Sequence, residues 1–113
     1  MITGKYPSLR LRRSRKNSWS RRLVSENNLS PSDFILPIFL IEGKNKTQPV
    51  KSMPGVNRYS INKLGIILDR AVKNGIPMVA LFPYTSSKLK NDLGSEALNE
   101  DNLVCRAIKY IKK

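Results

Sequence analysis

The stretch FILPIFLI, residues 34–41, decides the fold of this chain. Eight nearly continuous apolar residues between polar segments predict a strand covered on both faces, as in the parallel sheets of α/β proteins. Pro37 cannot donate a hydrogen bond to a neighbouring strand, so we expect a free side or a bulge at this position. A second stretch of the same kind, IPMVALF, occupies residues 76–82. The sequence therefore predicts two buried strands.

An amphipathic helix is expected between these strands. It follows Ser60, which is a good N-cap residue, and Gly75 supplies the stop signal. Apolar residues recur at spacings of three and four and form one stripe, comprising Leu64, Ile67, Leu68, Ala71 and Val72. Residues 42–59, rich in Gly, Pro and polar residues, predict an irregular connection before the helix. The order of strand, helix and strand predicts a right-handed βαβ unit with parallel strands.

A second amphipathic helix is expected from Asn99 onward. Asn99 is a good cap residue, and Glu100 and Asp101 place negative charge in the first turn. The apolar stripe of this helix comprises Leu103, Val104, Ala107, Ile108 and Ile111. Residues 83–98 predict another long irregular loop.

Two strands and two helices make at most a quarter of an eight-stranded barrel and less than half of an open doubly wound sheet. We therefore expect that neither strand is flanked on both sides. The expected fold class is α/β, and the sequence is expected to be truncated.

The positive charge is concentrated at the start of the chain. The sequence has 21 Lys and Arg against 8 Asp and Glu, a formal net charge of +13, and residues 1–24 contain no acid. This predicts a basic N-terminal arm, residues 1–24, followed by a globular part, residues 25–113. A short helix is expected from Ser18 to about Glu26, and the run from Ser30 to Asp33 predicts one helical turn. Alternative interpretations of the arm are a disordered charge run, a nucleic-acid-binding arm with Trp19 as a stacking platform, and a mitochondrial transit peptide.

The composition excludes several kinds of site. With no histidine and one cysteine, the chain has neither a disulfide framework nor the usual zinc-ligand cluster. No apolar run approaches the ~20 residues of a membrane span, and a reducing, cytoplasmic location is expected.

Few side chains outside the arm are candidates for chemistry. Lys88 and Lys90 lie in a polar loop where water keeps lysine charged, so we do not expect either to be a nucleophile. We expect Asp92 and Glu96 to be solvated and Cys105 to be a packing residue.

Four segments together resemble one enzyme family. They are RLRRSRKNSWSRRLVSENNLSPSDFILPIFLIEG, QPVKSMPGVNRYSI, GIPMVALFP and GSEALNEDNLVCRAIKYIK. In order and spacing they resemble the N-terminal portion of porphobilinogen synthase, also called 5-aminolevulinate dehydratase, and the basic arm resembles the bacterial form.

The resemblance implies the first part of a TIM (β/α)8 barrel with an arm that wraps a neighbouring subunit in a homo-octamer, anchored by Trp19 and Leu23. It implies a lyase that condenses two molecules of 5-aminolevulinate into porphobilinogen, with loss of two waters, for tetrapyrrole and haem biosynthesis. The family uses zinc or magnesium, and its catalytic lysines and metal ligands are expected beyond Lys113, so these 113 residues alone should be inactive. Phe82 is the one substrate-binding residue expected here: it is either a residue of the barrel wall or, as the resemblance implies, an apolar wall of the substrate pocket. The alternative from another class is a small basic nucleic-acid-binding module; for the enzyme, no specific nucleic acid and no membrane partner are expected.

Overall fold

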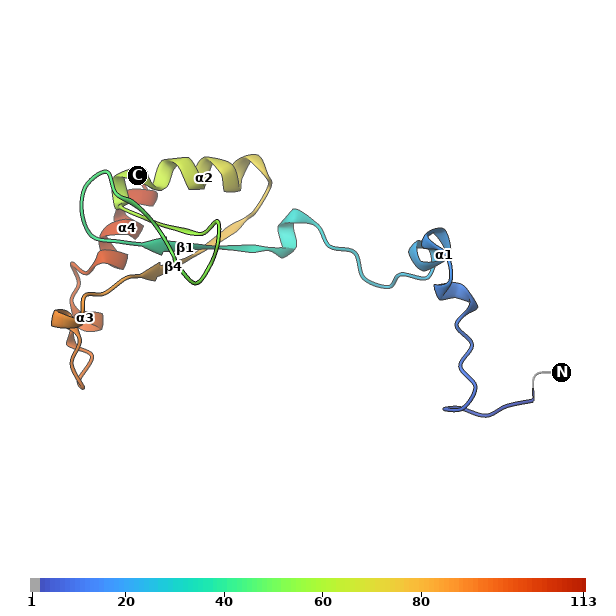
Figure 1. Cartoon of the computed structure of the whole chain (residues 1–113). Helices are drawn as coiled ribbons and strands as arrows, with labels where there is room; N and C mark the ends of the chain where they lie inside the picture. Colours follow the sequence, from blue (N-terminus) through green and yellow to red (C-terminus); the bar gives the residue numbers. More distant parts are fainter. Residues whose placement is uncertain (1–2) are drawn as a thin grey trace.

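A computed structural model describes residues 3–113, which form one four-stranded sheet with helices beside it and an extended N-terminal segment (Figure 1). The α-helices are α1 (Ser18–Leu23), α2 (Leu64–Lys73), α3 (Ser95–Leu98) and α4 (Leu103–Ile111). The strands are β1 (Ile35–Leu40), β2 (Thr47–Pro49), β3 (Asn57–Tyr59) and β4 (Met78–Pro83). Single 3₁₀ turns occur at η1 (Arg13–Arg15), η2 (Pro31–Asp33), η3 (Ile61–Lys63) and η4 (Ser87–Leu89).

The two apolar stretches form a parallel pair, in which β4 is the edge strand of the described sheet. β1 and β4 are in register along their whole lengths, from Ile35 opposite Met78 to Leu40 opposite Pro83. Helix α2 lies between them in the chain, so the predicted βαβ unit is confirmed.

Residues 42–59, predicted to be irregular, contain two further strands, so that prediction was wrong for β2 and β3. The strand order is β2-β3-β1-β4, with β3 parallel to β1 and β2 antiparallel to β3. The prediction that neither strand is flanked on both sides was also wrong, because β3 and β4 flank β1. Strands of three residues are too short to show a hydrophobic period, and these depend on contacts distant in sequence. One such contact is the buried Ser60, whose Oγ accepts from the Lys46 N–H at 2.9 Å.

Pro37 lies in β1 without disturbing the pairing with β4. The Ile41 N–H donates to the Tyr59 carbonyl on the β3 side, whereas the Leu40 carbonyl accepts from Tyr84 on the β4 side. Because successive backbone groups alternate in direction, the Pro37 nitrogen points away from β4. β3 pairs only with Phe39 and Leu40, so no described strand faces Pro37 on that side. The predicted free side is confirmed.

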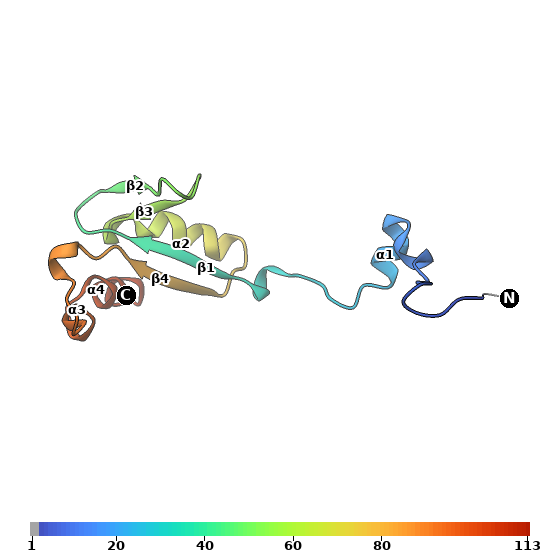
Figure 2. The same ribbon diagram turned by 60° about the horizontal axis from the view of Figure 1, so that its bottom comes forward.

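Both long helices pack against the same face of the sheet. The buried core joins Ile38 and Leu40 of β1 to Leu64 of α2 and to Leu103 and Ala107 of α4. Figure 2 shows β2, β3, β1 and β4 with α2 and α4 beside them. Since side chains alternate along a strand, the other residues of β1 and β4 point to the opposite face. We call this the inner face, and its residues are Ile35, Pro37, Phe39, Met78, Ala80 and Phe82.

The predictions of α2 and α4 contained two errors in the apolar stripes and one error in the N-cap of α4. Val72 and Ile108 are exposed, and the cap of α4 is Asn102, whose Oδ1 accepts from the Cys105 N–H at 2.9 Å, rather than Asn99. At about 100° per residue, Val72 lies about 80° round α2 from Leu64, and Ile108 lies about 140° round α4 from Leu103. Both side chains therefore point past the edge of the core. The helix begins later than predicted because residues 99–102 form a turn.

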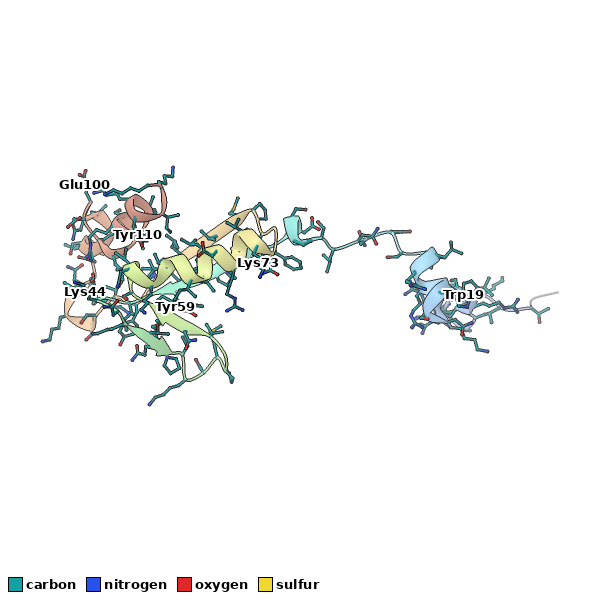
Figure 3. The ribbon with its side chains drawn as sticks, turned by 90° about the horizontal axis from the view of Figure 1, so that it is seen from above. Trp19, Lys44, Tyr59, Lys73, Glu100 and Tyr110 are labelled. Carbon is teal, nitrogen blue, oxygen red and sulfur yellow. The ribbon has the colours of Figure 1, made fainter. Side chains whose placement is uncertain are left out.

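The N-terminal segment extends away from the sheet. In Figures 1 and 3, α1 and Trp19 lie far from β1, and the described part of the molecule measures 71 × 37 × 25 Å. Helix α1 stops at Leu23, three residues short of its predicted end. Between α1 and the sheet, the helical turn predicted at Ser30 to Asp33 is confirmed as η2. Hydrogen bonds from the Ser30 N–H and then its hydroxyl hold the pKa of the Asp33 carboxyl below its usual value.

No helix in the described part of the chain combines the length and apolar character needed to cross a membrane.

Candidate functional site

The candidate site lies at the carboxyl ends of β1 and β4. In parallel α/β folds, loops that follow the strands meet at this edge and carry the chemistry. Two backbone hydrogen bonds continue the sheet past the strand ends, from Tyr84 N–H to the Leu40 carbonyl at 2.8 Å and from Ile41 N–H to the Tyr59 carbonyl at 3.0 Å. The first residues of both loops therefore have fixed positions.

An aromatic cluster covers the inner face at this edge. The rings of Phe39 and Phe82 are stacked, with centroids 5.6 Å apart. Tyr84 follows Phe82 by two residues, and the Arg58 guanidinium carbon lies 4.6 Å from the centre of its ring. We call these four residues, Phe39, Arg58, Phe82 and Tyr84, the inner-face cluster. It combines an apolar surface with one positive charge.

A cavity of about 680 Å³ lies at the same edge, between residues 83–97 and the first turn of α4. Ile41, Pro83 and Leu103 contribute apolar walls, while Lys46 and Lys90 contribute cations. Glu42, also in the lining, forms an ion pair with Arg106 of α4, which ties this helix to the loop after β1. This cavity suits a small amphiphilic molecule, but Phe82 is not among its lining residues.

Phe82, the substrate-binding residue expected from the sequence, belongs to the inner-face cluster. It is 48% exposed, so about half of its surface is available to a ligand. It lies near the carboxyl end of β4, and its contact with substrate stays a prediction.

The other side chains considered from the sequence are not brought together. Lys88 and Lys90 are both exposed, and only Lys90 lines the cavity. Glu96 lines the cavity and its Oε2 accepts from the Asn99 amide at 3.4 Å, whereas Asp92 is exposed outside it. Cys105 is a half-buried free cysteine on α4.

Residues 3–113 contain no group of three or more His, Cys, Asp or Glu side chains that could hold a metal ion. The donor set for the zinc or magnesium implied by the family resemblance is therefore not formed by the residues described here.

Arg58 and Tyr84 were not identified from the sequence. The position of Arg58 beside Phe39 could not be inferred, because β3 was not predicted. Tyr84 was assigned to a loop, although its two-residue spacing from Phe82 could have indicated that the strand pattern continues on the same face.

The family model for delta-aminolevulinic acid dehydratase matches residues 8–113. The delta-aminolevulinic acid dehydratase of Bradyrhizobium diazoefficiens is 50% identical over 106 residues, which are 94% of this chain and 30% of that protein. The corresponding protein of Chlamydia pneumoniae is 39% identical over 105 residues, 93% of this chain and 32% of that protein.

A solved structure agrees with these sequence matches. It is the delta-aminolevulinic acid dehydratase (porphobilinogen synthase) of Toxoplasma gondii ME49 in complex with the reaction product porphobilinogen. It superposes with a TM-score of 0.78 at 38% identity, covering 92% of this chain and 29% of that chain. The present chain thus spans about 30% of the length of these relatives. Because the sequence and structure alignments both cover more than nine tenths of its residues, the chain belongs to the delta-aminolevulinic acid dehydratase family.

Proposed function

We propose that the complete protein containing this chain is a porphobilinogen synthase. It would condense two molecules of 5-aminolevulinate into porphobilinogen and release two waters, for tetrapyrrole and haem biosynthesis. The observation that carries this proposal is the family match over residues 8–113. The alternative of a small basic nucleic-acid-binding module has no comparable support.

The arrangement of the helices supports a barrel. α2 and α4 share one core on one face of the sheet, whereas a doubly wound sheet has helices on both faces. In a TIM barrel the helices form an outer ring and the opposite face of every strand points to the barrel interior. We therefore propose that residues 25–113 form the first βα units of a TIM barrel, with the inner face lining its interior.

Within this barrel, we assign substrate contact to Phe82. Its ring lies at the carboxyl end of β4, on the side that faces the barrel axis, and stacks on Phe39. The stacking holds the ring in one orientation, so it can exclude water from one side of the substrate without taking part in bond making.

Lysine and metal chemistry are not assigned to the described residues. A lysine that forms a Schiff base must be neutral, which requires a dry pocket or a nearby cation. Lys88 and Lys90 are exposed, so neither meets this requirement. The zinc or magnesium expected for the family also has no fitting ligand set here, and we derive no step through it.

The basic arm, residues 1–24, is proposed to contact a neighbouring subunit in a homo-octamer. Trp19 and Leu23 are both largely exposed in the described chain, and an aromatic ring and a leucine among arginines can anchor such a contact. The arginines can pair bidentately with carboxylates of the neighbour. The free Cys105 fits a reducing, cytoplasmic location for the enzyme.

The test is to express the complete protein and measure porphobilinogen formation from 5-aminolevulinate. We expect saturable production by the complete protein. The 113-residue chain alone serves as the control, and we expect it to give neither product nor a lysine adduct after borohydride trapping. Absence of product from the folded, metal-supplemented complete protein would contradict the proposed function.

A further inference from the structure

Helix α2 ends at a chemically reactive pair of residues. Asn74 is the C-cap of the helix, and Gly75 follows it with a φ of 70°, in the left-handed region that glycine adopts without strain. This is the one Asn-Gly pair in the 113-residue sequence. An asparagine before a glycine is prone to deamidation, because glycine has no side chain to shield its backbone nitrogen from the asparagine amide.

The reaction at such a pair needs no reactant other than water. The Gly75 nitrogen loses its proton and attacks Cγ of Asn74, which forms a five-membered succinimide ring and releases the side-chain nitrogen as ammonia. Water then opens the ring at either of its two carbonyl carbons. The products are aspartate and isoaspartate, and in the latter the backbone runs through the former side chain. In both, the amide NH₂ has been replaced by an oxygen from water.

The helix end holds both reacting groups in hydrogen bonds. The Gly75 N–H donates to the Val72 carbonyl at 3.0 Å, and the Asn74 Nδ2 donates to the Arg70 carbonyl at 2.7 Å. In the succinimide ring the Gly75 nitrogen lies nearly in plane with Cβ of Asn74, and the observed ψ of 4° at Asn74 does not allow this arrangement. The backbone must therefore rotate at Asn74, and these hydrogen bonds must break, before the ring can close.

We propose that Asn74 and Gly75 form a deamidation site of the folded protein, and that opening of the last turn of α2 controls its rate. This inference does not depend on the proposed function. The ends of helices open more readily than their centres. If each of the two hydrogen bonds on the reacting groups has an ordinary net strength, deamidation in the folded protein should be about 5- to 150-fold slower than in the unfolded chain.

The products change the end of α2. A carboxylate at residue 74 cannot donate to the Arg70 carbonyl, and it adds negative charge where the last carbonyls of the helix already carry partial negative charge. Isoaspartate also lengthens the backbone between residue 74 and Gly75. This shifts the Ile76 N–H, which now donates to the Ala71 carbonyl at 3.0 Å in a Schellman motif. Both products therefore loosen the connection from α2 to β4.

The test measures initial rates of deamidation in the complete protein at mildly alkaline pH, both folded and in guanidinium chloride. Peptide mass spectrometry locates the product at residue 74, and methylation by an isoaspartate methyltransferase identifies isoaspartate. Two variants at the exposed Arg70 change the stability of the last turn without altering the reactive pair. Arg70→Gly weakens the helix, and Arg70→Ala is the matched control, because it removes the same side chain but favours the helix.

We expect measurable deamidation at Asn74 in the folded wild type, at a rate about 5- to 150-fold below that in denaturant. Arg70→Gly should deamidate about four- to fivefold faster than Arg70→Ala when folded, and at the same rate in denaturant. Asn74→Asp, which has the sequence of one product, should melt at a lower temperature than wild type.

Equal rates in the folded and denatured wild type would overturn the inference, because the helix end would then not control the reaction. Equal folded rates in the two Arg70 variants would overturn it for the same reason. A folded protein that stays unmodified at Asn74 while the denatured protein reacts would also overturn it, because other parts of the protein would then close the site. If Arg70→Gly does not fold, as judged by circular dichroism, the folded and denatured rates of wild type and Arg70→Ala decide.

Discussion

Replacing Phe82 by alanine in the complete protein tests the assignment of the inner face as the substrate side. Phe82 is 48% exposed, and Phe34, at the start of the sheet, is 49% exposed. Phe34→Ala is therefore a matched control, because it removes the same side chain at nearly the same exposure in the described chain. Because a fully buried Phe→Ala change costs about 3–5 kcal/mol, each half-buried change should cost about 2 kcal/mol of unfolding free energy.

The effect on substrate binding follows from the exposed part of the ring. A phenylalanine buries about 150–250 Å² when fully covered, so Phe82 offers about 70–120 Å² to a ligand. At about 25 cal/mol per Å², complete coverage corresponds to about 1.8–3 kcal/mol. If 5-aminolevulinate covers half of this area, the loss is about 0.9–1.5 kcal/mol, and KM should rise about 4- to 12-fold.

Steady-state kinetics with 5-aminolevulinate and chemical denaturation of the same samples provide the two measurements. We expect Phe82→Ala to raise KM by this factor and Phe34→Ala to leave KM within about twofold of wild type, at similar losses of stability. An equal KM in the two variants would refute the reasoning, because Phe82 would then be a wall residue without ligand contact.

Four further predictions address stability, assembly and charge. Leu40→Ala, at a fully buried position, should lower the unfolding free energy by about 2–5 kcal/mol in denaturant titrations, whereas Leu98→Ala, at an exposed position, should change it by less than about 0.5 kcal/mol. Deleting residues 1–24 from the complete protein should lower the order of the proposed oligomer without unfolding the proposed barrel, and an unchanged oligomer in size-exclusion chromatography with light scattering would contradict this. Because the pKa of Asp33 is lowered by Ser30, the folded state is stabilised above the unfolded pKa of about 3.8 and this stabilisation is lost as the pH falls through the lowered value; wild type and Asp33→Asn should therefore differ in melting temperature at pH 7 and converge at acid pH. Oligonucleotide binding by the complete protein should be weak and without sequence preference, with Kd about 10⁻⁴ to 10⁻⁶ M at physiological salt, and a nanomolar, sequence-preferring complex would favour a nucleic-acid-binding role instead.

The long elements of this fold could be predicted from their own residues. The apolar residues of β1 and β4 predicted strands correctly, and the stripes of α2 and α4 repeat at the helical period. The predicted cover on both faces of these strands is not found in the described chain, where Ile35, Met78 and Phe82 are exposed. The ends of the stripes were less predictable, because Val72 and Ile108 are apolar but point past the core that the other residues share. Whether an apolar residue at the edge of a stripe is buried depends on the neighbouring element, which the local sequence does not contain.

The candidate site could be predicted only where a strand carries it. Phe82 was singled out because it lies at the end of a recognisable strand and because the family resemblance supports a substrate contact there; this contact stays a prediction. Arg58 contacts Tyr84 from a strand of three residues that exists because it pairs with both β1 and β2. Both residues lie in segments that were predicted to be loops. Their contact arises from the pairing of strands distant in sequence, so neither residue type nor spacing could have revealed it.

Pro37 also affects where a strand of another molecule can pair with this sheet. A free strand edge is a template on which another molecule can add a strand, and natural sheets guard against this. An incoming strand on the open side of β1 would meet the Pro37 ring where it needs a donor, and would lose one hydrogen bond. β4 has its only proline at its last residue, so most of its outer edge carries no such block. If partly folded molecules associate, their first intermolecular pairing should therefore form along β4, and a proline or lysine introduced on that edge should suppress it.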